Sequence, residues 1–172
     1  MWEIVSAVAA AATTVIIAVT AIVAVHQIRQ LRVSTQLEGL LAMHSEYTAA
    51  EMNAAREFIV TELSEKLKDP TYRKEIIDGH ATSLTHPEFV VANFWEKVGM
   101  LVGEGVLDPK LYLVPFAYRC IEAWEQLKPV IELRRIKEPL QWKPFDHMVA
   151  LSRDYLLEYG PQFGDDHREA LR

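Results

Sequence analysis

Residues 4–25 are the most constraining stretch of the sequence, because these 22 residues contain no charge, no glycine and no proline. A helix needs about 20 apolar residues to cross the ~30 Å hydrocarbon layer of a bilayer. A single span must be helical, since only a helix satisfies its own backbone hydrogen bonds within lipid. A cleavable signal peptide would have a basic beginning and a shorter apolar segment. The sequence therefore predicts a permanent transmembrane anchor over residues 1–25.

The charges beside this stretch predict its orientation. Arg29 and Arg32 follow it within two turns, and no lysine or arginine precedes it. Basic residues accumulate on the cytoplasmic side of membrane helices. We therefore expect a single-pass protein of the cell inner membrane, with its N-terminus outside and residues 26–172 in the cytoplasm.

Two rows of side chains follow the predicted membrane helix at steps of three and four residues. One row has only small side chains: Ala7, Ala11, Thr14, Ala18 and Ala21. A bulkier row runs nearby: Val8, Ala12, Val15, Val19 and Ile22. Small side chains let helix backbones approach closely in lipid, where close packing drives association. The small row predicts a contact with a second copy of the chain or with another membrane protein, and an alanine-rich helix that contacts only lipid is the alternative.

Composition limits what the remaining residues can do. The chain has a formal net charge of -6 and a pI near 5.5, and its basic residues are mixed with acidic ones, which argues against non-specific nucleic-acid binding. Cys120 is the only cysteine, so an intrachain disulfide and a CxxC zinc or redox motif are excluded. The length that follows the anchor suffices for one domain.

Helical spacing of apolar residues continues beyond the anchor, which predicts a long juxtamembrane helix over residues 26–67. Thr35-x-x-Glu38 and Thr48-x-x-Glu51 both have the spacing of a capping box. We favour a break near Thr48, because a clear amphipathic run follows it. An apolar stripe on this helix must contact either its own domain or a neighbouring copy, and it gives the candidate interface outside the anchor: Leu37, Leu40, Met43 and Tyr47.

Helix signals repeat through residues 68–159. Asp69-Pro70 and Asp108-Pro109 each pair an N-cap residue with proline at the first helical position, and Thr85-x-x-Glu88 is a third start with capping-box spacing. We expect Gly99 and Gly103 to let another helix pack closely, and Cys120 to be an inert buried thiol. Polar residues from 131 to 144 predict a connector, and residues 160–172 predict a polar tail.

The sequence therefore predicts an all-α protein, in which one N-terminal transmembrane helix runs on into a cytoplasmic bundle of about four to five helices. This arrangement resembles a bacterial family of unknown function, whose members are single-pass proteins with a small cytoplasmic helical domain. The resemblance covers roughly residues 30–155 and depends on these residues: Phe94, Trp95, Val98, Gly99, Gly105, Val106, Leu107, Asp108, Trp124, Leu127 and Pro129. It implies an architecture and no catalytic role.

Catalytic and metal motifs are not recognisable in the sequence. His86-x-Glu88 begins like a zinc-deaminase signature, but the cysteine pair that this signature requires is absent. His80 and His86 are the only loop pair that could share a metal, and we interpret them as surface residues without a third ligand. Arg119, Glu122 and Glu125 are expected to form a solvated face with an i,i+3 ion pair.

Two classes of function remain. The first is a non-enzymatic structural or accessory protein, anchored in the lipid bilayer, that assembles as a homo-oligomer or as a subunit of a larger membrane complex. The alternative is a membrane-tethered recognition or sensor module that binds a cytosolic protein. The sequence predicts no enzyme activity, no cofactor, no metal, no small-molecule substrate and no nucleic-acid partner.

Overall fold

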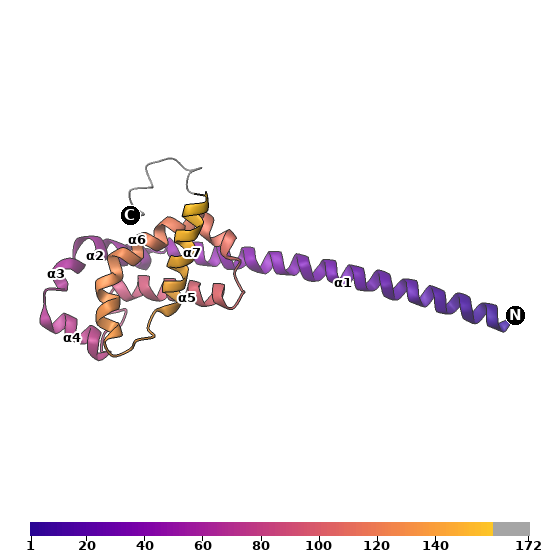
Figure 1. Cartoon of the computed structure of the whole chain (residues 1–172), viewed down its shortest axis with the longest axis horizontal. Helices are drawn as coiled ribbons and strands as arrows, with labels where there is room; N and C mark the ends of the chain where they lie inside the picture. The colour runs from indigo at the N-terminus through magenta and orange to yellow at the C-terminus, as the bar shows by residue number, and fades with distance from the viewer. Residues whose placement is uncertain (160–172) are drawn as a thin grey trace. The chain divides into compact units, whose positions relative to one another are not determined.

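The computed structural model describes the backbone of residues 1–159 and their side chains apart from Glu3 and residues 5–12. Every regular element in this part of the chain is a helix: α1 (Trp2–Tyr47), α2 (Ala50–Thr61), α3 (Leu63–Lys66), α4 (Pro70–Asp78), α5 (Glu88–Gly103), α6 (Pro109–Arg135) and α7 (Lys143–Tyr159) (Figure 1). The predicted all-α class, with one long apolar helix before a helical domain, is confirmed. The predicted tail, residues 160–172, lies outside the described residues.

Contacts divide the chain into two compact units, Met1–Gly39 and Leu40–Arg172. The regular structure of the first unit is the part of α1 up to Gly39, and the last turns of α1 belong to the second unit. In the second unit, α2 and α3 are part of the bundle, because Met52, Ile59 and Leu63 are buried in its core. The bundle therefore begins well before residue 68, where the sequence placed its start.

Helix α1 is long and apolar enough from Thr13 onward to cross a membrane, and none of its most apolar window is buried. It continues through Thr35, whose hydroxyl donates to the carbonyl oxygen of Leu31 at 3.0 Å. It ends at Tyr47, which confirms the predicted break near Thr48. The predicted capping box is wrong, because the Thr48 hydroxyl donates back to the carbonyl oxygen of His44 and α2 begins without a side-chain cap.

The two predicted Asp-Pro helix starts are confirmed. The carboxylate of Asp69 accepts a hydrogen bond from the backbone N–H of Thr71, and that of Asp108 accepts one from Lys110, both at 2.8 Å. Each side chain thereby satisfies an N–H that would otherwise have no partner in the first turn of α4 or α6. At the other end of α4, Gly79 adopts the left-handed conformation (φ 79°) in which many helices end.

The C-terminal end of α4 contacts α6, and the connection that follows α6, through polar and charged groups. The guanidinium of Arg134 donates to the carbonyl oxygen of Ile76 at 3.1 Å, and the ammonium of Lys137 donates to the carboxylate of Asp78 at 2.6 Å. Cations are favourable near the C-terminus of a helix, where the last carbonyl groups have no partner within the helix. Both contacts therefore favour the position that α4 takes beside α6.

Helix α5 is central to the second unit, since it contacts α2, α6 and α7. A Cβ atom added at Gly99 would lie 2.1 Å from the carbonyl oxygen of Pro144, at the start of α7. The prediction that Gly99 allows close packing is confirmed. The same prediction is wrong for Gly103, since a Cβ atom there would meet nothing within 4 Å.

The connection between α6 and α7 is shorter than predicted. Ile131 lies within α6 and is 1% exposed, so residues 131–135 belong to the helix rather than to a polar connector. Trp142 is also buried, and its indole N–H donates to the side-chain oxygen of Asn93 at 2.9 Å. The connection therefore contributes a core residue, which its polar sequence did not indicate.

Candidate interaction surfaces

The predicted small row on α1 is exposed where its side chains are described. Thr14, Ala18 and Ala21 are exposed on the helix surface. Ala7 and Ala11 are among the residues whose side chains the structure does not describe. The described part of the row is therefore accessible to a neighbouring helix.

The predicted stripe from Leu37 to Tyr47 divides into exposed and buried residues. Leu37 is 53% exposed, whereas Leu40 and Met43 pack partly buried against the core and Tyr47 is 8% exposed. Of the two partners that the sequence left open, the chain's own domain contacts Leu40, Met43 and Tyr47. Leu37 alone keeps most of its surface for another molecule.

Tyr47 is held among aromatic side chains of α5 and α6. Its ring centroid lies 5.5 Å from that of Phe94, 6.1 Å from that of Trp95 and 5.2 Å from that of Phe116. Edge and tilted contacts of this kind stabilise a core beyond simple burial. With most of its surface covered by these rings, Tyr47 is a core residue rather than an interface residue.

The small row and the stripe do not share one face of α1. Ala18 and Leu37 are nineteen residues apart, which places them roughly 100° apart around a straight helix of 3.6 residues per turn. Ala21 and Leu40 have the same separation. A single straight partner helix therefore cannot cover both sets.

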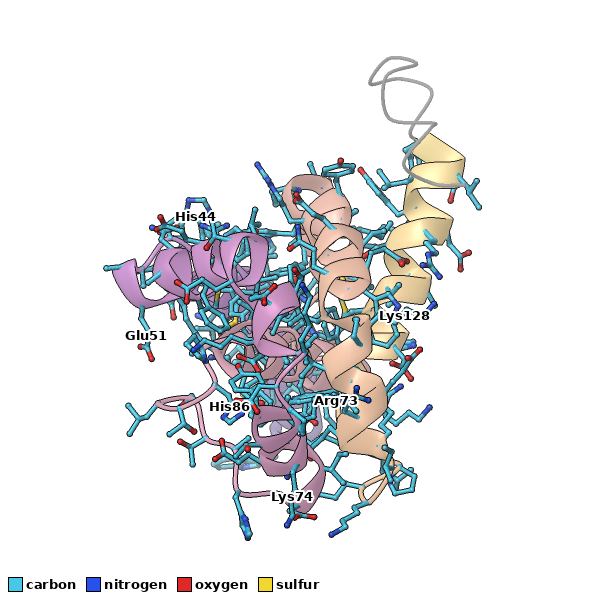
Figure 2. The ribbon with its side chains drawn as sticks, turned by 90° about the vertical axis from the view of Figure 1, so that its left-hand side faces the viewer. His44, Glu51, Arg73, Lys74, His86 and Lys128 are labelled. Atoms are coloured by element: carbon cyan, nitrogen blue, oxygen red, sulfur yellow. The ribbon has the colours of Figure 1, made fainter. Side chains whose placement is uncertain are left out.

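A buried polar cluster joins α4 to the start of α5, and His86 is part of it. Unlike Lys74, which is exposed (both are labelled in Figure 2), His86 is fully buried, so its interpretation as a surface residue paired with His80 is wrong. Its ring stacks on that of Tyr72 at 4.2 Å. Nε2 of His86 has no hydrogen-bond partner among the described residues, and the nearest carboxylate oxygen, from Glu75, lies 3.7 Å away. Burial therefore lowers the pKa of His86.

Glu88 is the second member of this cluster and is also fully buried. The Tyr72 hydroxyl lies 2.8 Å from both of its carboxylate oxygens. The predicted capping box with Thr85 is wrong, because the carboxylate contacts Tyr72 while the Thr85 hydroxyl contacts Nδ1 of His86 at 3.0 Å. Burial raises the pKa of Glu88, and burial together with Glu88 raises the pKa of Tyr72. Within the described residues, no group of three acidic, histidine or cysteine side chains could hold a metal ion.

A groove of about 480 Å³ lies on the second unit, lined by Tyr47, Asn53, Arg56, Glu57, Ile59, Val60, Thr61, Val91, Arg119, Glu122, Ala123 and Gln126. The guanidinium of Arg56 lies 4.3 Å above the ring of Tyr47 and donates to the side-chain oxygen of Asn53. No carboxylate of the described residues pairs with Arg56. Arg119 pairs with Glu122 at 3.2 Å, as predicted. The sequence did not indicate the groove, because its walls come from helices that are distant along the chain.

Cys120 has no access to solvent. Burial raises the pKa of its thiol to about 12, so the reactive thiolate is suppressed at neutral pH. The predicted burial of Cys120 on the apolar face of its helix is confirmed.

Comparison with protein families matches residues 8–152 to a domain of unknown function (DUF4760). Comparisons with curated proteins and with solved structures gave no match. The matched residues include most of α1 and the helices up to α7, so the match to an uncharacterised family begins 22 residues before the predicted resemblance and ends close to where that resemblance ends.

Proposed function

The chain belongs to the DUF4760 family, a domain of unknown function, and we propose its function from the geometry of its own residues. It is a non-enzymatic, membrane-anchored structural or accessory protein. It assembles as a homo-oligomer or as a subunit of a larger membrane complex, and its transmembrane helix makes the contact within the bilayer.

The observation that carries this proposal is the exposure of α1. Ile16, Ile17 and Ile22 are 65%, 64% and 69% exposed, although each is large and apolar. Leaving apolar surface in water costs about 25 cal/mol per Å². A bilayer removes that cost along the whole apolar stretch, and a neighbouring helix removes part of it. The arginines at 29 and 32 favour an N-terminus outside and a helical domain in the cytoplasm, at the cell inner membrane.

Thiol labelling tests the topology. A cysteine added after Arg172 should resist impermeant thiol reagents in intact cells and react once the membrane is opened. Trp2→Cys is the matched control, because Trp2 is 87% exposed and should react from outside. Labelling of the C-terminal cysteine in intact cells would overturn the orientation and the compartment together.

A second experiment tests the contact within the bilayer. Ala18→Leu adds bulk to the small row and should reduce the mass of the gently solubilised assembly, because the backbones can no longer approach closely. Ala12→Leu makes the same chemical change at a position roughly 100° or more around the helix from every residue of the small row, and it should leave the mass unchanged. An unchanged mass for Ala18→Leu would exclude the small row as the contact.

A membrane-tethered recognition module is the second candidate function, and the groove beside Arg56 favours it. A half-buried arginine that stacks on a tyrosine and lacks a carboxylate partner is suited to bind an acidic group of another protein. A photo-crosslinking residue at the exposed Val60, on the rim of the groove, should give one discrete product that Arg56→Gln abolishes. Arg73→Gln, an exposed arginine outside this groove, is the control and should leave the product intact.

A further inference from the structure

The part of α1 that follows the apolar stretch exposes large apolar side chains outside any core. Ile28, Leu31 and Val33 are 65%, 66% and 65% exposed, and Leu37 is 53% exposed. They belong to the unit formed by residues 1–39. Exposed large apolar side chains that lie together on one face indicate a contact surface. Val33 and Leu37 are four residues apart and share one face of α1, which favours a partner along that face.

One row of residues runs from the apolar stretch into this segment at alternating steps of three and four: Ile16, Val19, Val23, His26, Gln30, Val33 and Leu37. This is the spacing of the inner positions of a coiled coil, in which two helices wind around each other with their apolar rows in contact. All seven residues are exposed. We call them the heptad row.

We infer that a second copy of this chain packs along the heptad row as a parallel, in-register coiled coil. The inference rests on the membrane anchor of the proposed function, because two copies inserted in one bilayer with the same orientation are necessarily parallel. The heptad row contains no Asp, Glu, Lys or Arg, so two identical rows meet without repulsion between like charges. A two-fold pair of identical helices also closes on itself and leaves no unpaired row.

Gln30, a polar residue of the heptad row, selects the register of the pair. In an in-register pair, Gln30 faces Gln30 of the partner subunit, and each side-chain amide can both donate and accept a hydrogen bond. A shift by one heptad would place Gln30 against Val23 or Leu37 and leave its amide unpaired between apolar side chains. A polar residue at an inner position is known to fix register in this way.

The heptad row leaves the small row available to a different protein. Ala21 and Val23 are two residues apart and therefore lie roughly 160° apart around the helix. A homodimer along the heptad row could thus present Thr14, Ala18 and Ala21 outward. This arrangement reconciles self-association with membership of a larger membrane complex.

Disulfide crosslinking in native membranes tests the inference on the full chain. Val33→Cys and Leu37→Cys, made separately, place thiols on the heptad row, whereas Leu31→Cys and Thr35→Cys place them on other faces. Disulfides require Cβ atoms about 3.5–4.5 Å apart. Mild oxidation should therefore give a covalent dimer in a yield on the order of tenfold higher for Val33→Cys and Leu37→Cys than for Leu31→Cys and Thr35→Cys. The dimer should have twice the 19.6 kDa mass of one chain. The buried Cys120 can remain, and the parent chain controls for it.

All four positions are exposed, so none of these substitutions removes a core contact. Equal yields at Thr35 and Leu37 would indicate random collision and would overturn the inference, as would the absence of a dimer at Val33 and Leu37. Failure of the crosslinks in a chain with the expected thiol-labelling topology overturns the homodimer alone. The Ala18→Leu chain separates the two contacts. If this chain keeps its assembly mass and still crosslinks through Leu37→Cys, the small-row contact is overturned and the homodimer is supported.

Discussion

The hydroxyl of Tyr72 in α4 lies 2.8 Å from each carboxylate oxygen of Glu88, the first residue of α5. Glu88 is fully buried, and burial raises its pKa although the hydrogen bond from Tyr72 acts in the opposite direction. The pair therefore joins two helices while keeping an ionisable group inside the protein. Its contribution to stability must depend on pH.

Glu88→Gln should raise stability at pH 8. A carboxyl whose pKa is higher in the folded than in the unfolded state contributes most stability below its unfolded pKa, and that contribution is lost as the pH rises through the folded pKa. The amide keeps an acceptor for the Tyr72 hydroxyl without the buried charge. The urea midpoint of Glu88→Gln should therefore exceed that of the parent at pH 8, and the difference should shrink toward pH 4.

Glu65→Gln is the control for this measurement, because the Glu65 side chain is 77% exposed and should show no such pH-dependent difference. Burial lowers the pKa of His86, so protonation of His86 destabilises both chains in acid. A Glu88→Gln chain less stable than the parent across the whole range would mean that the charged carboxylate is favourable at this position.

Gly99→Ala should destabilise the domain by about 1–3 kcal/mol, the usual range for overpacking a core. The added methyl group would meet the backbone of Pro144, which cannot rotate away as a side chain can. Gly103→Ala is the matched control in the same helix, since its surroundings are open, and it should be neutral or stabilising by up to about 1 kcal/mol. Urea unfolding of both variants measures the difference, and similar values would refute the close approach of α5 and α7.

Tyr47→Ala should cost about 3–5 kcal/mol, as for other large aromatic side chains removed from a core. Leu41→Ala, six residues earlier in the same helix, should change stability by no more than about 0.5 kcal/mol because Leu41 is 59% exposed. Tryptophan fluorescence during urea unfolding would report both, since Trp95 is a neighbour of Tyr47. A mild effect of Tyr47→Ala would return this residue to the candidate interface.

Trp142→Ala should likewise cost about 3–5 kcal/mol, because Trp142 is 1% exposed and its indole is hydrogen-bonded to Asn93. Trp124→Ala should cost less, since Trp124 is only partly buried against the core. Thermal unfolding of the two variants under identical conditions gives the order. A larger loss for Trp124→Ala would mean that the connection before α7 is not part of the core.

Local signals in the sequence were sufficient for the helical class and for two helix starts. Asp69 and Asp108 cap their helices through a backbone N–H only two residues away, so the relevant atoms are close together in any chain with that sequence. The Thr85 and Glu88 pair has an equally good local spacing, but Glu88 has a partner in Tyr72, sixteen residues earlier. A capping rule cannot anticipate a competitor that only the tertiary fold supplies.

The same reason explains why the candidate interface on α1 contains both exposed and buried residues. Leu37 and Tyr47 belong to the same predicted apolar stripe, yet one is exposed and the other is enclosed by rings from α5 and α6. Periodicity identifies residues that require a partner but does not say which partner they have. The polar sequence around Trp142 predicted a connector rather than a core residue, yet Trp142 is buried. Its indole N–H donates to Asn93, 49 residues earlier, a partner that the local sequence does not reveal.

The two ends of α4 should respond differently to ionic strength. Near its start, α4 is held by the stacked and largely buried contacts of Tyr72. At its end, α4 is held by the partly exposed ion pair of Lys137 with Asp78 and by the hydrogen bond from Arg134 to a terminal carbonyl group. Screening shortens from about 10 Å at 0.1 M salt to about 3 Å at 1 M, and it acts mainly on exposed charges. Amide hydrogen exchange in high salt should therefore accelerate first in the last turn of α4 and advance toward Tyr72, so that this helix opens from one end.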